Sequence, residues 1–485
     1  MLLYKEAACP KRSDDETMAA PSTSSDVPAA ITVLEQCRVS PSHDGPFGEV
    51  SIPLTFFDVP WLDNHPVQRL FFYRWPGLTT THFAASALPR LKRSLSLALC
   101  HYYPLIGRLE PLPRSSKRLH IVCTDADSVT FTVAECVVED GDYFHHLAGN
   151  HPRRVEMFRP LVPGMISASA LLALQVTVFP GAGVCVGVSI GHAACDGSGF
   201  VSFMKAWASA CRSEENEAPP AGELPVIDRT LVSDPGGELY TALFDSLKYL
   251  AGLSWPAVEG PDVERSTFLL RRAHIEELRR RVSEQRPPAP PVLRYSSFVL
   301  TCAYVWVCLL KAGWPPQGEE DAAYLIFTVN CRGRFRPPIP AAYFGNCLGP
   351  CTMRARRSDL LGVDGVGLAA EVIAHAVASQ GHGDQLLEWP KECFPQMAVW
   401  LRGRPLSISG SPRFGVYGTD FGWGRPAKVE VVGIEKSGAM ALAESGEEDG
   451  GIEVGLALRS PEMARFTSLF TAGLEDAGNG RGRPG

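Results

Sequence analysis

One short stretch of the chain contains two overlapping patterns that could do chemistry. Gly187, Ser189 and Gly191 match the Gly-x-Ser-x-Gly turn on which serine hydrolases carry their nucleophile. His192 follows directly, with Asp196 four residues later. Histidine is the side chain whose ordinary pKa best suits proton transfer at neutral pH. The stretch therefore predicts either a nucleophilic serine or a general base.

The residues before His192 favour the histidine over Ser189. From Val184 to Ile190, branched apolar residues alternate with smaller ones, which predicts a strand that passes through Ser189. A hydrolase serine needs a tight turn where a strand passes directly into a helix. In this chain the turn comes later, and the next helix is expected to start near Gly199. A serine hydrolase remains as an alternative function.

His192 is expected where this strand ends, on a glycine-bounded loop from which side chains project into clefts. The residue pattern alone leaves a plainer interpretation open. In it, His192 is bonded to backbone and Asp196 is the N-cap of the following helix. Cys195 has no second base beside it in the sequence, so we interpret it as a small buried thiol.

Length and composition limit the class of protein. The 485 residues suggest two domains, and 45% hydrophobic with 20% charged residues is typical of a soluble globular chain. A net charge of −7 argues against a nucleic-acid partner or an anionic membrane. The apolar runs are too short for a membrane span, and the N-terminus is too charged for a signal peptide. The 14 cysteines include no CxxC pair, so we expect a reducing, cytoplasmic location.

The helices and strands expected around these residues are those of an α/β protein. Strand alternation and helical periodicity occur in two halves of similar size, each expected to be a mixed β-sheet with flanking helices. A charged, proline-rich segment separates the halves. The expected division is a disordered extension at 1–30, a first domain at 31–212, a crossover linker at 213–240, a second domain at 241–474 and a flexible tail at 475–485.

Several motifs together resemble the plant BAHD family of CoA-dependent acyltransferases. HAACDG begins at His192 and DFGWG at Asp420, one in each half, and PLTFFDVPWL, PVQRLFFYRWP and YYPLIGRL agree as well. The similarity covers about Ile31 to Leu474. YFGNC, from Tyr343, resembles the branch that acts on anthocyanins and other flavonoid or phenolic glucosides, often with malonyl donors. Asn330 stands where many close relatives have aspartate.

The resemblance implies a fold like that of chloramphenicol acetyltransferase, with an active-site channel at the domain interface. It implies acyl transfer from malonyl-CoA or hydroxycinnamoyl-CoA to a hydroxyl of a phenolic glucoside, in a ternary complex, with His192 as the general base. Acyl-CoA is then a co-substrate, no cofactor is permanently bound, and the enzyme is expected to be a monomer. A non-catalytic binding protein of the same fold is the further alternative.

The resemblance also gives roles to residues around the histidine. Asp196 resembles a family residue that turns away from the substrate and pairs with an arginine, for which Arg332 is the candidate. Asp420 is either the anchor of its loop or a second acid–base group. Gly422 and Gly424 would support that loop as a glycine-broken turn.

Three further residues are expected at the CoA site. Ser296 and Ser297 stand at the start of a helix, where they are either CoA contacts or plain N-caps. Trp423 is expected to pack beside the CoA channel. No metal site is expected, because the histidines at 145, 146 and 151 lack a cysteine or carboxylate at metal-binding spacing.

Overall fold

The structure is a computed structural model, and it describes most of the chain. Described are residues 30–479 except 43–47, 63–64, 112–117, 138–141, 214–223, 251–252, 254, 286–293 and 316–319. The expected extension at 1–30 lies outside the described residues except for Ala30. Most of the charged part of the expected linker also lies outside them.

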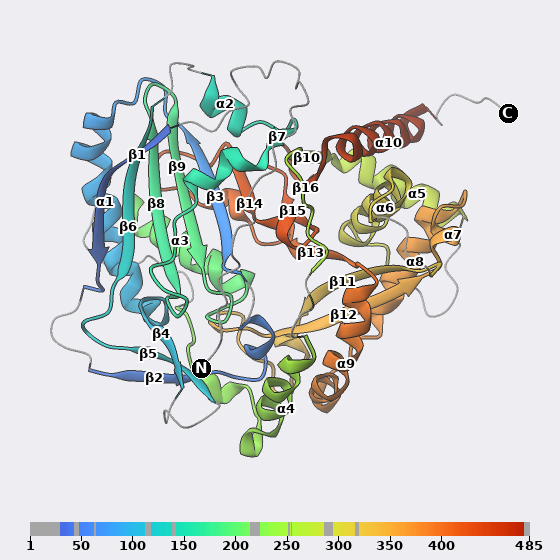
Figure 1. Cartoon of the computed structure of the whole chain (residues 1–485), viewed down its shortest axis with the longest axis horizontal. Coiled ribbons are helices and arrows are strands. Elements are labelled where there is room, and N and C mark those ends of the chain that lie inside the picture. The colour runs from blue at the N-terminus through green and yellow to red at the C-terminus, as the bar shows by residue number, and fades with distance from the viewer. Residues whose placement is uncertain are drawn as a thin grey trace, which may run out of the picture.

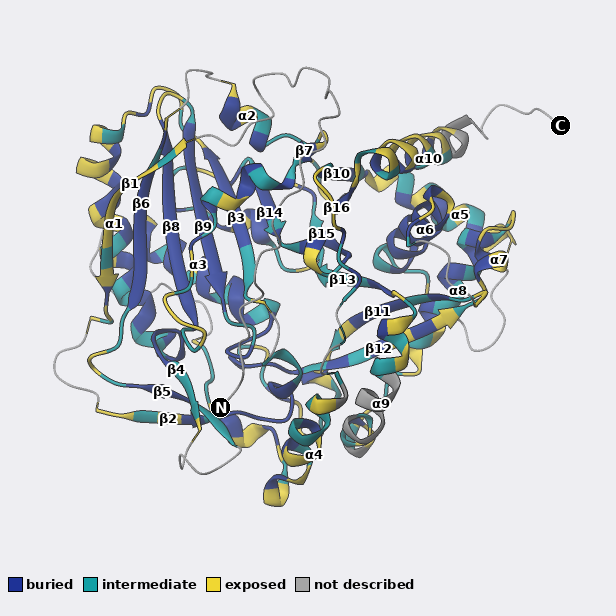
Figure 2. Ribbon diagram, viewed as in Figure 1, coloured by how far each residue is buried: buried dark blue, intermediate teal, exposed yellow. Residues whose placement is uncertain are grey.

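A mixed sheet forms the framework of the first half (Figure 1). Its strands in spatial order are β1 (Ala30–Val39), β6 (Val129–Val137), β8 (Leu172–Phe179), β9 (Gly183–Ile190), β3 (Val67–Arg74) and β14 (Lys428–Val432). β6 and β8 run parallel, whereas the other neighbours are antiparallel. β8 and β9 are buried along their whole length (Figure 2), because the sheet is covered on both faces.

A second mixed sheet forms the framework of the other half (Figure 1). Its order is β12 (Leu348–Ala355), β11 (Ala323–Asn330), β13 (Leu406–Gly410), β15 (Ala439–Glu444), β16 (Ile452–Arg459), β10 (Val263–Leu270) and β7 (Arg153–Arg154). A small third sheet has the order β2 (Val50–Pro53), β5 (Leu119–Cys123) and β4 (Arg108–Pro111). The α/β class and the two mixed sheets are as expected from the sequence.

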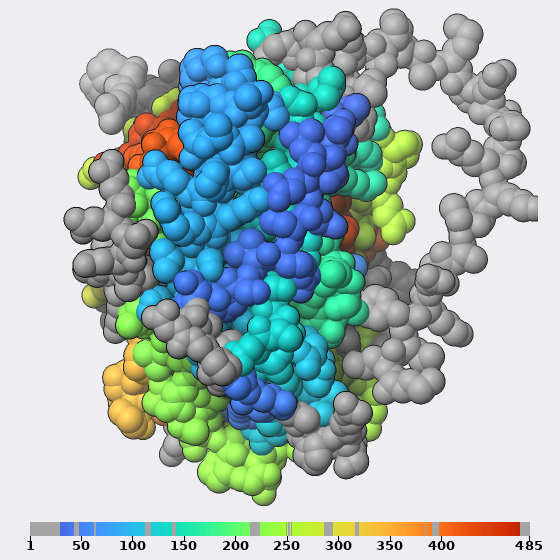
Figure 3. Space-filling model, turned by 90° about the vertical axis from the view of Figure 1, so that its left-hand side faces the viewer, coloured from blue at the N-terminus to red at the C-terminus, as the bar shows by residue number. Residues whose placement is uncertain are grey.

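Helices flank both sheets. On the side of the first sheet are α1 (Thr80–His101), α2 (Tyr143–Leu147) and α3 (Gly197–Arg212), whereas α4 (Glu238–Ser246) lies next to α9 (Figure 1). The later helices are α5 (Arg272–Gln285), α6 (Ser297–Ala312), α7 (Arg357–Leu360), α8 (Gly365–Ala378), α9 (Trp389–Arg402) and α10 (Ser460–Asn479). Figure 3 shows α1 (light blue) and β1 (dark blue) on the outer face of the first half. Among the described residues, no helix is both long and apolar enough to cross a membrane.

The two sheets exchange strands, which departs from the expected division of the chain. β14 comes from the expected second domain but pairs with β3, from Lys428 opposite Phe72 to Val432 opposite Gln68. β7 comes from the expected first domain but pairs with β10. α10 also continues to Asn479, beyond the expected start of the tail. Alternation predicts that a segment is a strand but says nothing about its partner.

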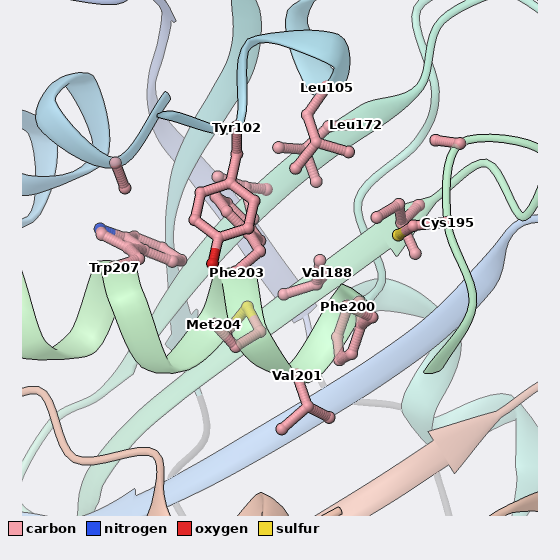
Figure 4. Close-up of a cluster of buried hydrophobic side chains, with 14 of the residues drawn as sticks. Tyr102, Leu105, Leu172, Val188, Cys195, Phe200, Val201, Phe203, Met204 and Trp207 are labelled. Carbon is pink, nitrogen blue, oxygen red and sulfur yellow. The ribbon is translucent and has the colours of Figure 1, made fainter. Parts of the chain in front are cut away.

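Helix α3 directly follows the loop that contains His192, and its apolar face packs into the core of the first half. Phe200, Phe203, Met204 and Trp207 are buried on that face against Val188 of β9 and the C-terminal end of α1 (Figure 4). Burying each such large side chain stabilises the fold by about 1.5–3 kcal/mol. The helix start, and the loop before it, are therefore fixed by the core.

Candidate active site

His192 lies in the loop between β9 and α3, as the sequence predicts. β9 ends at Ile190 and α3 begins at Gly197, so the intervening loop is short. The backbone carbonyl of His192 accepts a hydrogen bond of 2.9 Å from Nδ2 of Asn346. The imidazole is stacked on the indole of Trp61, with ring centroids 3.8 Å apart and planes 6° from parallel. The ring is thus held from the backbone and from one face.

The environment of His192 favours the neutral imidazole. Burial lowers the pKa of His192 below its ordinary value of 6.5 because it disfavours the charged form. Its own backbone carbonyl and the carboxylates of Asp196 and Asp58 oppose this effect. At neutral pH the ring is therefore free to accept a proton, which is what a general base requires.

Asp196 is both the N-cap of the plainer interpretation and the arginine partner that the family resemblance implies. Oδ1 accepts hydrogen bonds from the backbone N–H groups of Ser198 (3.1 Å) and Gly199 (3.2 Å), so the residue is the N-cap of α3. Oδ2 forms an ion pair of 2.7 Å with NH1 of Arg332 and accepts from the N–H of Cys347 (3.2 Å). The expected contact with Arg332 is present, and it joins the two halves behind the histidine loop.

A second buried carboxylate, Asp58, organises the other side of the loop. Oδ1 accepts from the backbone N–H of Asn346 (3.2 Å) and from its Nδ2 (2.9 Å). Oδ2 accepts from Thr55 and lies 3.5 Å from NH1 of Arg229. Arg229 in turn donates to the carbonyl of Ala194 within the loop (3.2 Å). Asp58 thus links both Asn346 and Arg229 to the segment that carries His192.

The sequence analysis assigned no role to Trp61, Asp58, Arg229 or Asn346. Asp58 and Trp61 lie in PLTFFDVPWL, and Asn346 lies in YFGNC. Both stretches contributed to the family resemblance, which was the available signal. Residue type and spacing do not show that these segments meet at the histidine, because Asp58 and Asn346 lie 288 positions apart in the sequence.

Asp420 holds its own loop in the structure. Oδ1 accepts hydrogen bonds from the backbone N–H groups of Gly422 (2.8 Å) and Gly424 (2.9 Å), while Oδ2 lies 3.4 Å from NH1 of Arg212. Both glycines have positive φ, 97° and 87°, which explains why this turn needs glycine. These contacts are those of a loop anchor.

Asp420 and His192 lie toward opposite ends of α3. Asp196 caps the first turn of this 16-residue helix, whereas Asp420 contacts Arg212 in its last turn. At 1.5 Å per residue the helix is about 24 Å long. The structure therefore brings Asp196 and Arg332 to the histidine but places Asp420 away from it.

The expected CoA residues occupy different surroundings. Trp423 packs among aromatic rings of the first half, at centroid distances of 5.4 Å from Tyr73 and 5.6 Å from Trp75. Ser296 is the N-cap of α6 and accepts from the N–H of Val299 (3.3 Å). The Oγ of Ser297 lies 3.4 Å from NH2 of Arg279, which places a cationic group at the start of α6.

Ser189 and Cys195 are both buried in surroundings that do not suit a nucleophile. Ser189 is fully buried within β9, and its Oγ donates to the carbonyl of Pro163 (2.7 Å). It does not lie on a strand-to-helix turn. Burial raises the pKa of the Cys195 thiol well above its ordinary value, which disfavours the thiolate that nucleophilic attack requires.

No metal site is present among the described residues: no group of three or more histidine, cysteine, aspartate or glutamate side chains converges there. His146 and His151 contact each other, with Nδ1 and Nε2 2.9 Å apart.

Solved structures share this two-domain α/β fold. Vinorine synthase aligns with a TM-score of 0.67 at 21% identity, covering 91% of this chain and 98% of that one. TRI101 of F. sporotrichioides, complexed with coenzyme A and T-2, aligns with a TM-score of 0.61 at 16% identity, covering 86% and 97%.

Sequence comparison identifies the family. The profile of the Transferase family matches residues 29–472, so the chain belongs to that family, and the resemblance to BAHD acyltransferases is confirmed. Similar proteins include a malonyl-coenzyme A:anthocyanin 3-O-glucoside-6''-O-malonyltransferase of Dahlia pinnata (35% identical) and phenolic glucoside malonyltransferase 1 of Arabidopsis thaliana (36%), each covering 92% of this chain and 98% of the relative. A coumaroyl-CoA:anthocyanidin 3-O-glucoside-6''-O-coumaroyltransferase 2 of Arabidopsis thaliana is 33% identical over 91% of this chain and 97% of its own length.

Proposed function

We propose that this protein transfers an acyl group from malonyl-CoA or a hydroxycinnamoyl-CoA to a sugar hydroxyl of a phenolic glucoside. The observation that carries the proposal is His192, held against Trp61 with a pKa lowered by burial. The names of the similar proteins supply the substrate classes, since they use malonyl or coumaroyl donors and anthocyanin or phenolic glucoside acceptors.

In the proposed mechanism, His192 accepts the proton of the acceptor hydroxyl while its oxygen attacks the thioester carbon. The tetrahedral intermediate then collapses, the carbon–sulfur bond breaks, and the leaving CoA thiolate takes the proton from the imidazolium. The products are an ester and free CoA. A thioester is already activated, so direct attack in a ternary complex needs no covalent enzyme intermediate. General-base assistance of this kind contributes about 10²–10⁴-fold in rate.

The surrounding residues position this base. Asp196 and Arg332 fix the start of α3, and Asp58 fixes Asn346, which holds the His192 carbonyl. In this proposal Asp420 supports its loop, with Gly422 and Gly424, and takes no part in proton transfer.

Acyl-CoA is the co-substrate, as the family implies. We place its anionic part near Ser296 and Ser297, where the start of α6 offers free backbone N–H groups and Arg279, itself paired with Glu276, lies beside Ser297. We propose that Trp423, within its aromatic cluster in the first half, packs beside the CoA channel at a point separate from Ser296 and Ser297. We further propose a cytoplasmic monomer without nucleic-acid or membrane partners. The net charge of −7 and the many free buried cysteines support that setting.

A direct assay tests the function. The purified protein is incubated with malonyl-CoA, p-coumaroyl-CoA or acetyl-CoA and a set of flavonoid and simple phenolic glucosides, and products are identified by mass spectrometry. We expect a product whose mass increases by one acyl group, together with an equal amount of free CoA. If no CoA thioester gives a product with any glucoside, the proposal is wrong.

His192→Ala is the critical variant and Cys195→Ala its matched control, since both residues lie in the same loop. We expect His192→Ala to lose at least 10²-fold in turnover while CoA binding is retained. Cys195→Ala should keep most of the activity, because its buried thiol takes no part in the reaction. Near-normal turnover by His192→Ala would show that another group is the base.

A further inference from the structure

Arg69 is a buried arginine with no carboxylate in direct contact among the described residues. It lies on β3, is 4% exposed, and its Nε is fully buried without a hydrogen bond. Among the described residues its side chain forms neither a hydrogen bond nor an ion pair. Its neighbours are the rings of Phe200 and Phe414, whose centroids lie 5.1 Å and 5.9 Å from the guanidinium carbon.

Four of the five other buried arginines among the described residues have a carboxylate partner, whereas the fifth, Arg357, donates to the backbone carbonyls of Pro315 and Leu310. The pairs are Arg153 with Glu430 (2.9 Å), Arg265 with Glu430 (2.7 Å), Arg229 with Asp58 (3.5 Å) and Arg332 with Asp196 (2.7 Å). Removing a charge from water without pairing it costs several kcal/mol, so a fold that keeps such a cation calls for an explanation.

The charge of Arg69 is partly offset by the carboxylate of Glu444. Glu444 acts on Arg69 through space, but its two oxygens accept hydrogen bonds from the backbone N–H groups of Tyr417 (2.9 Å) and Gly415 (3.2 Å). Burial lowers the pKa of Arg69 to about 10, so the guanidinium is still charged at neutral pH. Arg69 is therefore a buried charged side chain that no carboxylate contacts directly.

The position of Arg69 connects it with the histidine loop. It pairs in register with Val188, near the end of β9 where that loop begins. Phe200 belongs to the first turn of α3, next to the N-cap Asp196. Phe414 packs so closely on Gly197 that a Cβ there would lie 2.6 Å from the ring. The cation and its two rings thus lie beside the first turn of the helix that carries the site.

We propose that Arg69 binds the free carboxylate of a dicarboxylic acyl group, such as malonyl, while the thioester carbon lies at His192. The inference rests on the proposed function and narrows its donor to the dicarboxylic class. A guanidinium can bind a carboxylate through two parallel hydrogen bonds. Phe200 and Phe414 exclude water from this contact, which strengthens it, and an uncharged acyl group would leave Arg69 unpaired.

The test compares donors that differ in this carboxylate. With one uncharged phenolic glucoside as acceptor, kcat/KM is measured for malonyl-CoA, acetyl-CoA and p-coumaroyl-CoA. We expect Arg69→Met to lower kcat/KM for malonyl-CoA by about 10- to 100-fold, the range for losing hydrogen bonds to a charged group. Acetyl transfer should change only a few-fold, and Arg69→Lys should be intermediate. Arg74→Met, at the exposed end of the same strand, is the matched control and should behave like the unaltered protein.

Two results would overturn the inference while the proposed function stands. One is an unaltered protein that transfers p-coumaroyl but not malonyl groups, and the other is an equal loss with every donor in Arg69→Met. If no donor is used at all, the proposed function itself fails, and this inference with it. Because Arg69→Met could fail to fold, the methyl monoester of malonyl-CoA is also tested on the unaltered protein. We expect it to be used at least about 10-fold less well than malonyl-CoA, and equal use contradicts the inference.

Discussion

The indole of Trp61 lies flat against the imidazole of His192, with centroids 3.8 Å apart and planes 6° from parallel. Trp61 ends the short helical turn Val59–Trp61, which directly follows Asp58. Asp58 also holds Asn346, whose side chain donates to the His192 carbonyl. One buried carboxylate therefore controls both the ring's stacking partner and the backbone bond of the catalytic loop. The arrangement makes Trp61 a positioning residue for the proposed base.

Replacing Trp61 should reduce turnover more than it reduces binding of the donor. In Trp61→Ala the imidazole loses the surface that fixes its orientation, and we expect kcat to fall about 10- to 100-fold, because small misplacement of a reacting group is costly. KM for acyl-CoA should change little. Trp61→Phe keeps a ring and should retain most of the activity. Equal activity of both variants and the unaltered protein would show that the stacking has no role.

The pH dependence of kcat/KM should report the environment of His192. Only the neutral imidazole can act as base, so activity falls as pH decreases through the pKa of His192. Since burial lowers that pKa below 6.5, the midpoint of the acid limb should lie below pH 6.5. Initial rates between about pH 4.5 and 8, with tryptophan fluorescence to confirm folding at each pH, provide the measurement. A midpoint at or above 6.5 would contradict the assigned environment.

The ion pair between Asp196 and Arg332 should couple the stabilities of the two halves. Asp196→Asn keeps an N-cap for α3 but leaves Arg332 uncompensated, and removing one partner of a buried pair costs about 3–5 kcal/mol. Arg332→Met should be similarly destabilising. In a double-mutant cycle by denaturant unfolding, the combined loss should be smaller than the sum by about 1–3 kcal/mol. Strictly additive losses would show that the two side chains do not interact directly.

Asp420 allows its two proposed roles to be separated by a pair of variants. Asp420→Asn keeps the Oδ1 acceptor for the N–H groups of Gly422 and Gly424, so the loop should persist and activity should remain within a few-fold. Asp420→Ala loses both bonds, and we expect a decrease of about 1–2 kcal/mol in the free energy of unfolding, as for a lost helix cap. Inactivity of Asp420→Asn, with unchanged stability, would instead assign it an acid–base role.

The sequence predicted those features of the fold that depend on local pattern. The alternation around Ser189 located β9, and the apolar face from Phe200 to Trp207 located α3. The sheet partner of β14 was not predictable, because Lys428–Val432 reads as a strand of its own half. Its pairing with β3 depends on long-range packing that no local pattern encodes.

The residues of the site likewise fall into those that a local sequence pattern indicates and those that come together only in the folded chain. The spacing of His192 and Asp196 on one loop is a local feature that singled them out, but it left a plain structural interpretation open. Their proposed roles, like the choice of Arg332, came from the family resemblance. Trp61 and Asn346 gave no sign of their position, because each belongs to a different segment and meets the histidine only in the folded chain. The distance between Asp420 and His192 was hidden too, because it is set by the length of α3.

Ser189 provides the decisive comparison with a serine hydrolase. Its Oγ donates to the carbonyl of Pro163 and is fully buried inside β9, so it has neither the exposed turn nor the freedom that a nucleophile needs.

Ser189→Ala leaves that carbonyl without its donor, which costs about 1–3 kcal/mol of stability. Acyl transfer should nevertheless stay within a few-fold of normal, because the proposed reaction passes through a ternary complex. Rapid-quench experiments should accordingly detect no acyl-enzyme burst. An acyl group trapped on Ser189 or Cys195, at a rate matching turnover, would show instead that the reaction proceeds by nucleophilic catalysis.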